Sequence, residues 1–361
     1  MAKAGAKSGA KSGAKFGGKS KKPVFNYNAE LQLLKQQGPG RLYLIYGEEE
    51  YLRDRFLEAL RAACVPEGNE FSLRRLAGKS ASLGDISEAV DAMPFFTERS
   101  YVEIRDYDLN RCKDETWKQL KEVLENIPDW CTVVFVQSPE LVPDGRLAAV
   151  KGLKKLGKAL EITHQDAATL AGWVRKRFQA LGKDIRRDDA DYLVFLSGTA
   201  MLRLIPEIEK AAAYAGDQLV TRADIDATAN RLPEAQIWSL TDRLAEGKFD
   251  EAAGVLSDLL SDKDNHPILL TAILGQQYRR MYAAKVCQEE RRSREETMEL
   301  CDIRYDFIYD KLRTAIRPYS AEQLGRAVRL CADYDYRMKS TGLDAGDLIR
   351  ELFCRLAAGA L

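Results

Sequence analysis

Gly47 stands where a nucleotide-binding protein would begin its phosphate-binding loop, between a short apolar run and a helical pattern. Such a loop reads Gly-x-x-x-x-Gly-Lys-Ser/Thr, because glycine lets the backbone cradle phosphates, lysine reaches them and the hydroxyl binds magnesium. Here Gly47 is followed by Glu48, Glu49 and Glu50, and the segment as far as Asp54 has no second glycine, lysine, serine or threonine. Three carboxylates in one helical first turn would repel each other, by about 1–4 kcal/mol per pair at ~4 Å. Residues 47–50 are therefore interpreted as a degenerate phosphate-binding loop that does not bind nucleotide in the usual manner. Locally, they form the ordinary, capped start of a helix.

Other residues of the kinds used in catalysis and metal binding do not form a recognisable site. Asp106 follows an apolar run, where an acid could hold magnesium, but without a phosphate cradle a solvated acid at a strand end is favoured. The two histidines, His164 and His266, are far apart, and seven cysteines occur without any Cys-x-x-Cys pair. We expect no catalytic residue, no metal and no cofactor, in a reduced cytosolic chain.

Phe95 and Phe96 form a pair of large apolar side chains next to Pro94. Adjacent residues on a helix diverge by about 100°, so both rings cannot easily face one core. Asp85 is a plausible N-cap for the helix that precedes them, whose apolar stripe is Ile86, Ala89, Val90 and Met93. Either the two rings bury in the core before the next strand, as such pairs more often do, or at least one is exposed for binding.

Strand and helix patterns alternate in the first half of the chain. Short apolar runs at residues 41–46, 101–104 and 132–136 predict buried strands, and helical spacing lies between them. This alternation favours an α/β domain with a parallel sheet at residues 24–163. The pattern after about His164 is helical almost throughout, which predicts a small helical domain at 164–232 and a helical bundle at 233–361.

The chain of 361 residues carries 55 basic and 55 acidic side chains, but the charges are unevenly spread. Removing the seven lysines of residues 1–22 leaves 48 basic against 55 acidic residues, so the body is net acidic. The first 23 residues are rich in lysine, alanine and glycine, a composition that predicts a disordered arm. This arm either contacts DNA or only extends the chain. Its lysines at four-residue spacing are Lys3, Lys7, Lys11, Lys15 and Lys19.

A second mixed basic and aromatic segment lies at residues 276–280. Arg279 and Arg280 there could contact a phosphate backbone, whereas a solvated helix face with Tyr278 buried is the favoured interpretation. No apolar run is long enough to span a membrane, and the N-terminus lacks the apolar core of a secretory signal, so a cytoplasmic location without membrane contact is expected.

The order and spacing of several segments together resemble the delta subunit family of the bacterial DNA polymerase III clamp loader. The resemblance spans nearly all of the chain after its lysine-rich start, and no single segment decides it. The segments are residues 43–52, 91–99, 206–210, 234–242, 276–279 and 332–342.

This resemblance implies an AAA+-like α/β domain, a helical lid domain and a C-terminal helical collar that joins the subunits of the loader. It implies a subunit without ATP hydrolysis of its own, within an ATP-driven complex of the DNA polymerase holoenzyme. The implied partners are the beta sliding clamp, the gamma/tau ATPase subunits, the delta-prime subunit and primed DNA. The chain also lacks the Ser-Arg-Cys motif by which some neighbouring subunits send an arginine into an adjacent ATP site.

The family's clamp-binding residues match Met93, Phe95 and Phe96 by position, with Arg99 as a local support. Their implied role is insertion into an apolar groove of the clamp. Two alternatives remain open: an AAA+ ATPase with a divergent nucleotide site, and a stand-alone DNA-binding protein that uses the lysine-rich arm.

Overall fold

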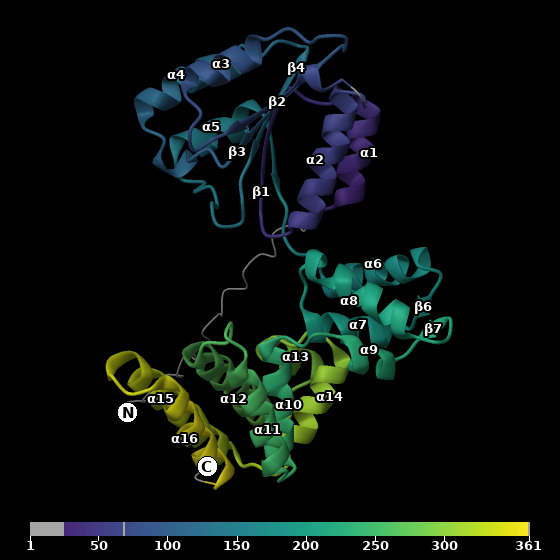
Figure 1. The fold of residues 1–361 in the computed structure, drawn as a ribbon. Helices are drawn as coiled ribbons and strands as arrows, with labels where there is room; N and C mark the ends of the chain where they lie inside the picture. Colours follow the sequence, from purple (N-terminus) through teal and green to yellow (C-terminus); the bar gives the residue numbers. More distant parts are fainter. Residues whose placement is uncertain (1–24, 68, 360–361) are drawn as a thin grey trace, which may run out of the picture.

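The computed structural model describes residues 25–67 and 69–359, and its first part is an α/β unit (Figure 1). The strands are β1 Leu42–Tyr46, β2 Leu73–Ala77, β3 Ser100–Arg105, β4 Cys131–Val136 and β5 Lys158–Glu161. The helices are α1 Tyr27–Gln37, α2 Glu50–Cys64, α3 Leu83–Asp91, α4 Asp114–Glu125 and α5 Ala148–Leu156, with short 3-10 helices η1 Glu70–Ser72 and η2 Leu109–Arg111.

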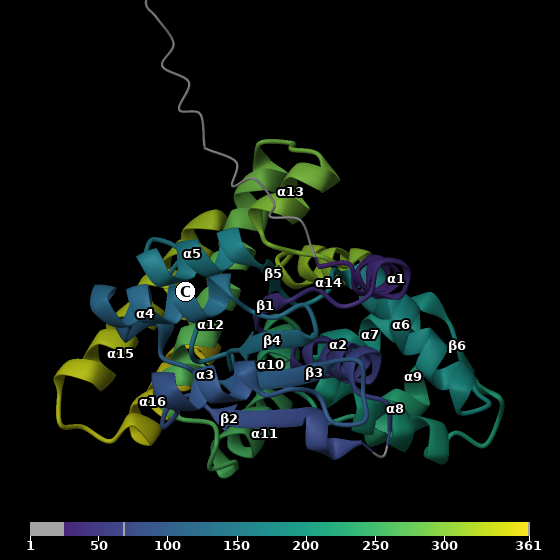
Figure 2. The same ribbon diagram turned by 90° about the horizontal axis from the view of Figure 1, so that it is seen from above.

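The five strands form one parallel sheet in the order β2-β3-β4-β1-β5. Helices α1 and α2 cover one face, and α3, α4 and α5 cover the other (Figures 1 and 2). Side chains alternate between these layers: Leu44 packs with α3 to α5, whereas Tyr43 and Ile45 pack with α2. The predicted mixed fold with a parallel sheet is confirmed.

A second group of elements begins after β5, at the carboxyl edge of the sheet (Figure 1). The apolar core on the α2 side of the sheet continues without interruption into these helices, through residues such as Leu170, Val174 and Leu204. The elements are α6 Ala167–Ala180, β6 Asp184–Ile185, α7 Arg187–Ser197, α8 Met201–Tyr214, β7 Leu219–Val220 and α9 Arg222–Thr228.

The remaining helices form a bundle with its own core, in which Tyr278 and Tyr334 are fully buried. Helices α12 and α15 pack against each other and form the most extensive helix–helix contact of this bundle. The helices are α10 Pro233–Ala245, α11 Phe249–Ser261, α12 Pro267–Glu289, α13 Arg294–Leu300, α14 Asp306–Ala315, α15 Ala321–Ser340 and α16 Ala345–Ala357. In the described part of the chain, no helix combines the length and apolar character needed to cross a membrane.

The three strands predicted from apolar runs correspond to β1, β3 and β4, and the helical second half is also confirmed. The edge strands β2 and β5 were missed, as was the short β6–β7 pair. The expected domain boundaries near 163 and 232 fall in connections, between β5 and α6 and between α9 and α10.

Candidate functional site

The turn after β1 is shaped by close packing. Gly47 has φ 130°, and a Cβ atom there would lie 2.2 Å from the carbonyl oxygen of Ile162, which follows β5. Because a side chain would collide with the neighbouring backbone, this position requires glycine whatever the turn binds. The glycine therefore gives no support to a phosphate cradle.

The three glutamates after Gly47 occupy different environments, which corrects the prediction that all three lie in the first helical turn. Glu50 is the first residue of α2 and pairs with Arg53 at 3.0 Å. Glu49 is the N-cap and only 1% exposed, whereas the side chain of Glu48 is 67% exposed. Glu50 pairs with Arg53, whereas the carboxylates of Glu48 and Glu49 lie on opposite sides of the His164 imidazole, 4.0 Å from Nε2 and 3.0 Å from Nδ1.

The buried carboxylate of Glu49 contacts three separate segments. Its oxygens accept from the backbone N–H groups of Tyr51, at 3.3 Å, and Met201, at 3.2 Å, and one lies 3.0 Å from Nδ1 of His164. The hydrogen bond with Glu49 raises the pKa of His164, although partial burial of the imidazole opposes the shift. The positive ends of α2 and α8 thus meet a carboxylate of the chain itself.

Arg53 and Asp106 stand at two further positions that bind phosphate or magnesium in nucleotide sites, and here both side chains bind other groups of the same chain. Arg53, at the place of the phosphate-binding lysine, is 5% exposed and paired with Glu50 and Asp54. Asp106 has a φ of 58°, and its carboxylate accepts from the N–H of Ser138 at 2.8 Å. Asp106 is thus a backbone cap, which corrects the interpretation of a merely solvated acid.

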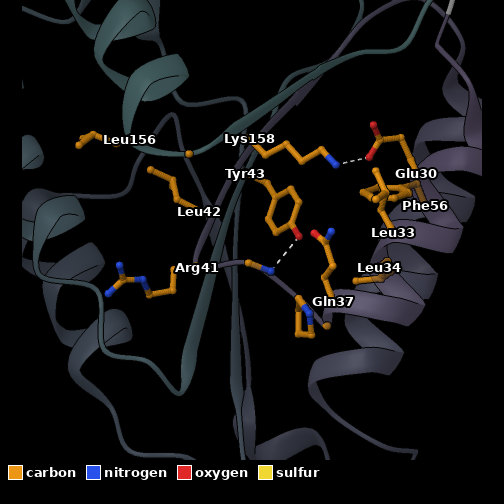
Figure 3. Close-up of a pocket in the computed structure, with 14 residues that line it drawn as sticks. Glu30, Leu33, Leu34, Gln37, Arg41, Leu42, Tyr43, Phe56, Leu156 and Lys158 are labelled. Atoms are coloured by element: carbon orange, nitrogen blue, oxygen red, sulfur yellow. Dashed lines mark hydrogen bonds and ion pairs between the residues drawn. The ribbon is translucent and has the colours of Figure 1, made fainter.

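A cavity of about 350 Å³ lies at the opposite, amino edge of the sheet, between α1 and the starts of β1 and β5 (Figure 3). Tyr43 projects into it and accepts from the N–H of Gly40 at 2.8 Å, and Lys158 pairs with Glu30 across it. Arg41 also lines this cavity, and β1 separates it from Gly47, so the cavity is distinct from the turn after β1.

Residues 93–96, called the aromatic loop below, connect α3 to β3 and project from the same amino edge of the sheet. Met93 is 78% exposed, Phe95 58% and Phe96 85%. Helix α3 ends at Asp91, so Met93 does not continue its apolar stripe, and the core alternative for the two phenylalanines is wrong. The helix N-cap is Ser82 in a capping box with Asp85, which corrects the prediction of Asp85 as the cap.

Hydrogen bonds hold the aromatic loop in an unfavourable backbone conformation. Phe96 has a φ of 59°, in the left-handed region that bulky residues seldom adopt. The side-chain amide of Asn69 donates to the carbonyl of Phe96 at 2.9 Å. The hydroxyl of Ser72 accepts from the N–H of Phe95 at 2.9 Å and donates to its carbonyl at 3.1 Å. Behind the loop, Arg99 donates to the carbonyl of Pro39 at 3.2 Å, so its side chain points into the protein body.

Two family models match most of the described chain. Residues 43–163 match the family described as DNA polymerase III, delta subunit, and residues 234–355 match the C-terminal domain of the same subunit. The chain belongs to the DNA polymerase III delta subunit family. The recognition suggested by the sequence segments is confirmed.

Two delta proteins are distant in sequence but match this chain over most of their length. The DNA polymerase III subunit delta of Bacillus subtilis is 24% identical over 322 residues, covering 86% of this chain and 91% of that protein. The probable DNA polymerase III subunit delta of Aquifex aeolicus is 23% identical, covering 86% and 89%. The solved Bacillus subtilis DNA clamp loader delta protein covers 92% of this chain and 100% of its own, with 22% identity and a TM-score of 0.50, which shows a shared fold.

Two groups of residues were predicted to contact DNA: the arginines of residues 276–280 and the lysines near the N-terminus. Tyr278 and Gln277 are buried in the bundle, Arg279 is exposed, and Arg280 donates to the carbonyl of Cys301 at 3.2 Å. This favours the helix-face interpretation and leaves Arg279 as the accessible cation of the pair. The lysines predicted to contact DNA, Lys3, Lys7, Lys11, Lys15 and Lys19, lie outside the described residues.

Sequence reasoning missed the roles of Phe71, His164 and Met201. Phe71 lies beside Phe95, with ring centroids 6.3 Å apart, although 24 positions separate them in the chain. The contacts of Glu49 likewise come from residues more than 100 positions away. A single Phe or His has no local pattern that reports such neighbours.

Proposed function

We propose that this chain binds the beta sliding clamp through the aromatic loop and opens the ring, so that the clamp can be loaded onto primed DNA. The observation that supports this most directly is the outward display of Phe95 and Phe96 on a hydrogen-bonded loop. A bulky residue such as Phe96 at positive φ costs about 1–2 kcal/mol of stability. A loop that served only to connect α3 to β3 would gain nothing in return for this cost.

The apolar area of the aromatic loop is sufficient for partner capture. An aromatic side chain buries ~150–250 Å², and two of them at ~25 cal/mol per Å² would contribute up to about 7–12 kcal/mol before entropic costs. Because the loop is held in place before binding, less conformational entropy is lost on association. In this proposal the loop inserts into an apolar groove of the clamp, with Met93 at its margin, and the exposure of the three side chains supports it.

In this proposal the energy for loading comes from other subunits. The carboxylate of Glu49 accepts hydrogen bonds at the N-termini of α2 and α8, and Arg53 is paired with Glu50 and Asp54, which supports a chain without ATP hydrolysis of its own. The gamma/tau ATPase subunits and the delta-prime subunit are the proposed partners in the complex, joined through the α10–α16 bundle as a collar. Residues 24–163, 164–232 and 233–361 are the proposed domains of this cytoplasmic subunit.

Clamp binding by the full-length chain tests the proposal, measured by surface plasmon resonance on immobilised beta clamp. Phe96→Ala and Phe95→Ala should each weaken binding at least roughly tenfold, as truncation of interface anchors does. Phe249 is a matched control, because it is 47% exposed at the start of α11, far from the loop in sequence, and its change to alanine should leave affinity unchanged. Full clamp affinity in both loop variants would refute the proposal.

Two further measurements separate the alternative functions. Titration calorimetry with magnesium-ATP should give no tight binding, whereas tight magnesium-dependent binding would identify a divergent ATPase. Deletion of residues 1–22 should leave clamp affinity intact. A stand-alone DNA-binding protein would instead show salt-sensitive DNA affinity that this deletion removes, and no affinity for the clamp.

A further inference from the structure

Phe71 extends the apolar surface of the aromatic loop from a different part of the chain. It lies in η1, immediately before β2, and is 78% exposed. Its ring meets Phe95 edge-to-face at 6.3 Å, and Phe95 meets Phe96 edge-to-face at 4.4 Å. The three rings therefore form one row with Phe95 at its centre.

The sheet and the loop hydrogen bonds fix this row. Strands β2 and β3 pair in parallel, with Leu73 opposite Tyr101, so the segments that precede them leave the same edge of the sheet. Asn69 and Ser72, which flank Phe71, provide the side chains that bind the backbone of Phe96 and Phe95. The segment that carries Phe71 is thus the same segment that positions the aromatic loop.

The size of the row argues against chance exposure. Single apolar residues are common on protein surfaces, but three neighbouring rings that are each more than half exposed present roughly 300–500 Å² of apolar area. This equals the largest apolar patch of a typical monomer, and such patches are often functional. With Met93 also exposed, the patch is continuous with the proposed clamp contact.

We infer that Phe71 is a further clamp-binding residue, which enters the same groove as Phe95 and Phe96 and sets the width of groove that the chain accepts. This inference rests on the proposed function and adds a contact from outside the aromatic loop. The partner is the same clamp, because insertion of Phe95 would bring the neighbouring ring of Phe71 against the same surface.

Clamp titration with Phe71→Ala, Phe96→Ala and the control Phe249→Ala tests the inference. Phe71→Ala should weaken binding by roughly five- to thirtyfold without lowering the unfolding midpoint. If Phe96→Ala loses affinity and Phe71→Ala does not, Phe71 is not a contact and the proposed function stands. If neither loses affinity, the proposed function itself fails.

A cross-linking measurement distinguishes direct contact from support of Phe95. Phe71→p-benzoylphenylalanine in the full-length chain should form a covalent adduct with the clamp on illumination, and the same replacement at Phe249 should not. A chain that binds the clamp fully but gives no adduct at position 71 would overturn the inference.

The carboxylate of Glu49 joins the α/β unit to the helices that follow it. It caps α2, accepts from the first N–H of α8 and meets His164 in the connection between β5 and α6. We also propose that this carboxylate is an internal substitute for a bound anion, which holds α8 against the sheet without any ligand. The grounds are its burial to 1% and its position at two helix N-termini, where anions bind favourably.

Anion rescue tests this second proposal. Glu49→Ala should lower the melting temperature of the full-length chain by roughly 4–10 °C, and sodium acetate should restore part of that loss relative to sodium chloride at equal ionic strength. Glu48→Ala is the matched control: it removes an exposed carboxylate 4.0 Å from Nε2 of His164, so it should lower the melting temperature by at most about 2 °C, and acetate should not change that value. A Glu49→Ala chain as stable as the control, or a loss of stability that acetate does not reduce, would overturn the proposal.

Discussion

Replacement of Phe96 by glycine should separate stability from clamp binding. Glycine adopts a φ of 59° without strain, which relieves about 1–2 kcal/mol, whereas its greater freedom in the unfolded chain costs about 0.5–1 kcal/mol. Loss of the edge contact with Phe95 removes up to roughly another 0.5 kcal/mol at this exposed site. The free energy of unfolding should therefore change by between about −0.5 and +1.5 kcal/mol.

The same replacement should weaken clamp binding strongly. Phe96 exposes 85% of its surface in the free chain, so burial of a ring of ~200 Å² could contribute up to about 4 kcal/mol. A loss of about 2–4 kcal/mol corresponds to roughly 30- to 800-fold weaker affinity. Guanidinium denaturation and surface plasmon resonance on the same preparations measure the two effects.

Phe95→Gly is the matched control, because Phe95 lies outside the left-handed region and glycine there relieves no strain. It should weaken clamp binding and also lower the free energy of unfolding by about 0.5–2 kcal/mol, because it adds backbone freedom and removes the edge contacts with Phe71 and Phe96. A loss of 3–5 kcal/mol of stability in Phe96→Gly would mean that Phe96 is packed as a core residue. That result would refute the argument for a strained display of the ring.

Three further changes probe the turn after β1 and the helix before the aromatic loop. The raised pKa of His164 means that the stabilising Glu49 pair is fully present below about pH 6.5 and is lost as pH rises through the folded-state pKa. Denaturation of wild type and His164→Ala should therefore give a larger stability difference at pH 6 than at pH 9, and an equal difference at both would contradict this. Gly47→Ala should cost roughly 2–4 kcal/mol, since its Cβ would meet the carbonyl of Ile162, and a measured cost below about 1 kcal/mol would show that the turn relaxes freely. Ser82→Ala should cost about 1 kcal/mol through loss of the α3 cap, and unchanged thermal unfolding would show that the cap contributes nothing.

The central strands were predictable because both faces of each are covered. Strands β1 and β4 are fully buried, so their sequences are continuous apolar runs. Strand β2 lies at the edge of the sheet, and its charged residues Arg74 and Arg75 are exposed. Strand β5, at the other edge, begins with Lys158 and ends with Glu161. Edge strands lack the apolar pattern on which sequence reasoning depends.

The details of the candidate sites depended on tertiary contacts. Three successive glutamates are equivalent in the sequence, and only the positions of His164 and Met201 decide that Glu49 is the buried one. Met93 fits the helical spacing of α3, but the helix ends before it, since the residue that precedes a proline disfavours helical backbone. The exposure of Phe95 and Phe96 depended similarly on hydrogen bonds from the segment before β2.

The environment of Glu49 restricts how a nucleotide site could arise in this chain. Introducing the second glycine and the lysine of a phosphate-binding loop would leave the carboxylate of Glu49 at the ends of α2 and α8. Removing that carboxylate first would leave the N–H of Met201 without its acceptor and the imidazole of His164 with the exposed carboxylate of Glu48, 4.0 Å away. The first order of change leaves a carboxylate that repels phosphate, and the second passes through a less stable sequence, so the turn as it stands opposes nucleotide binding.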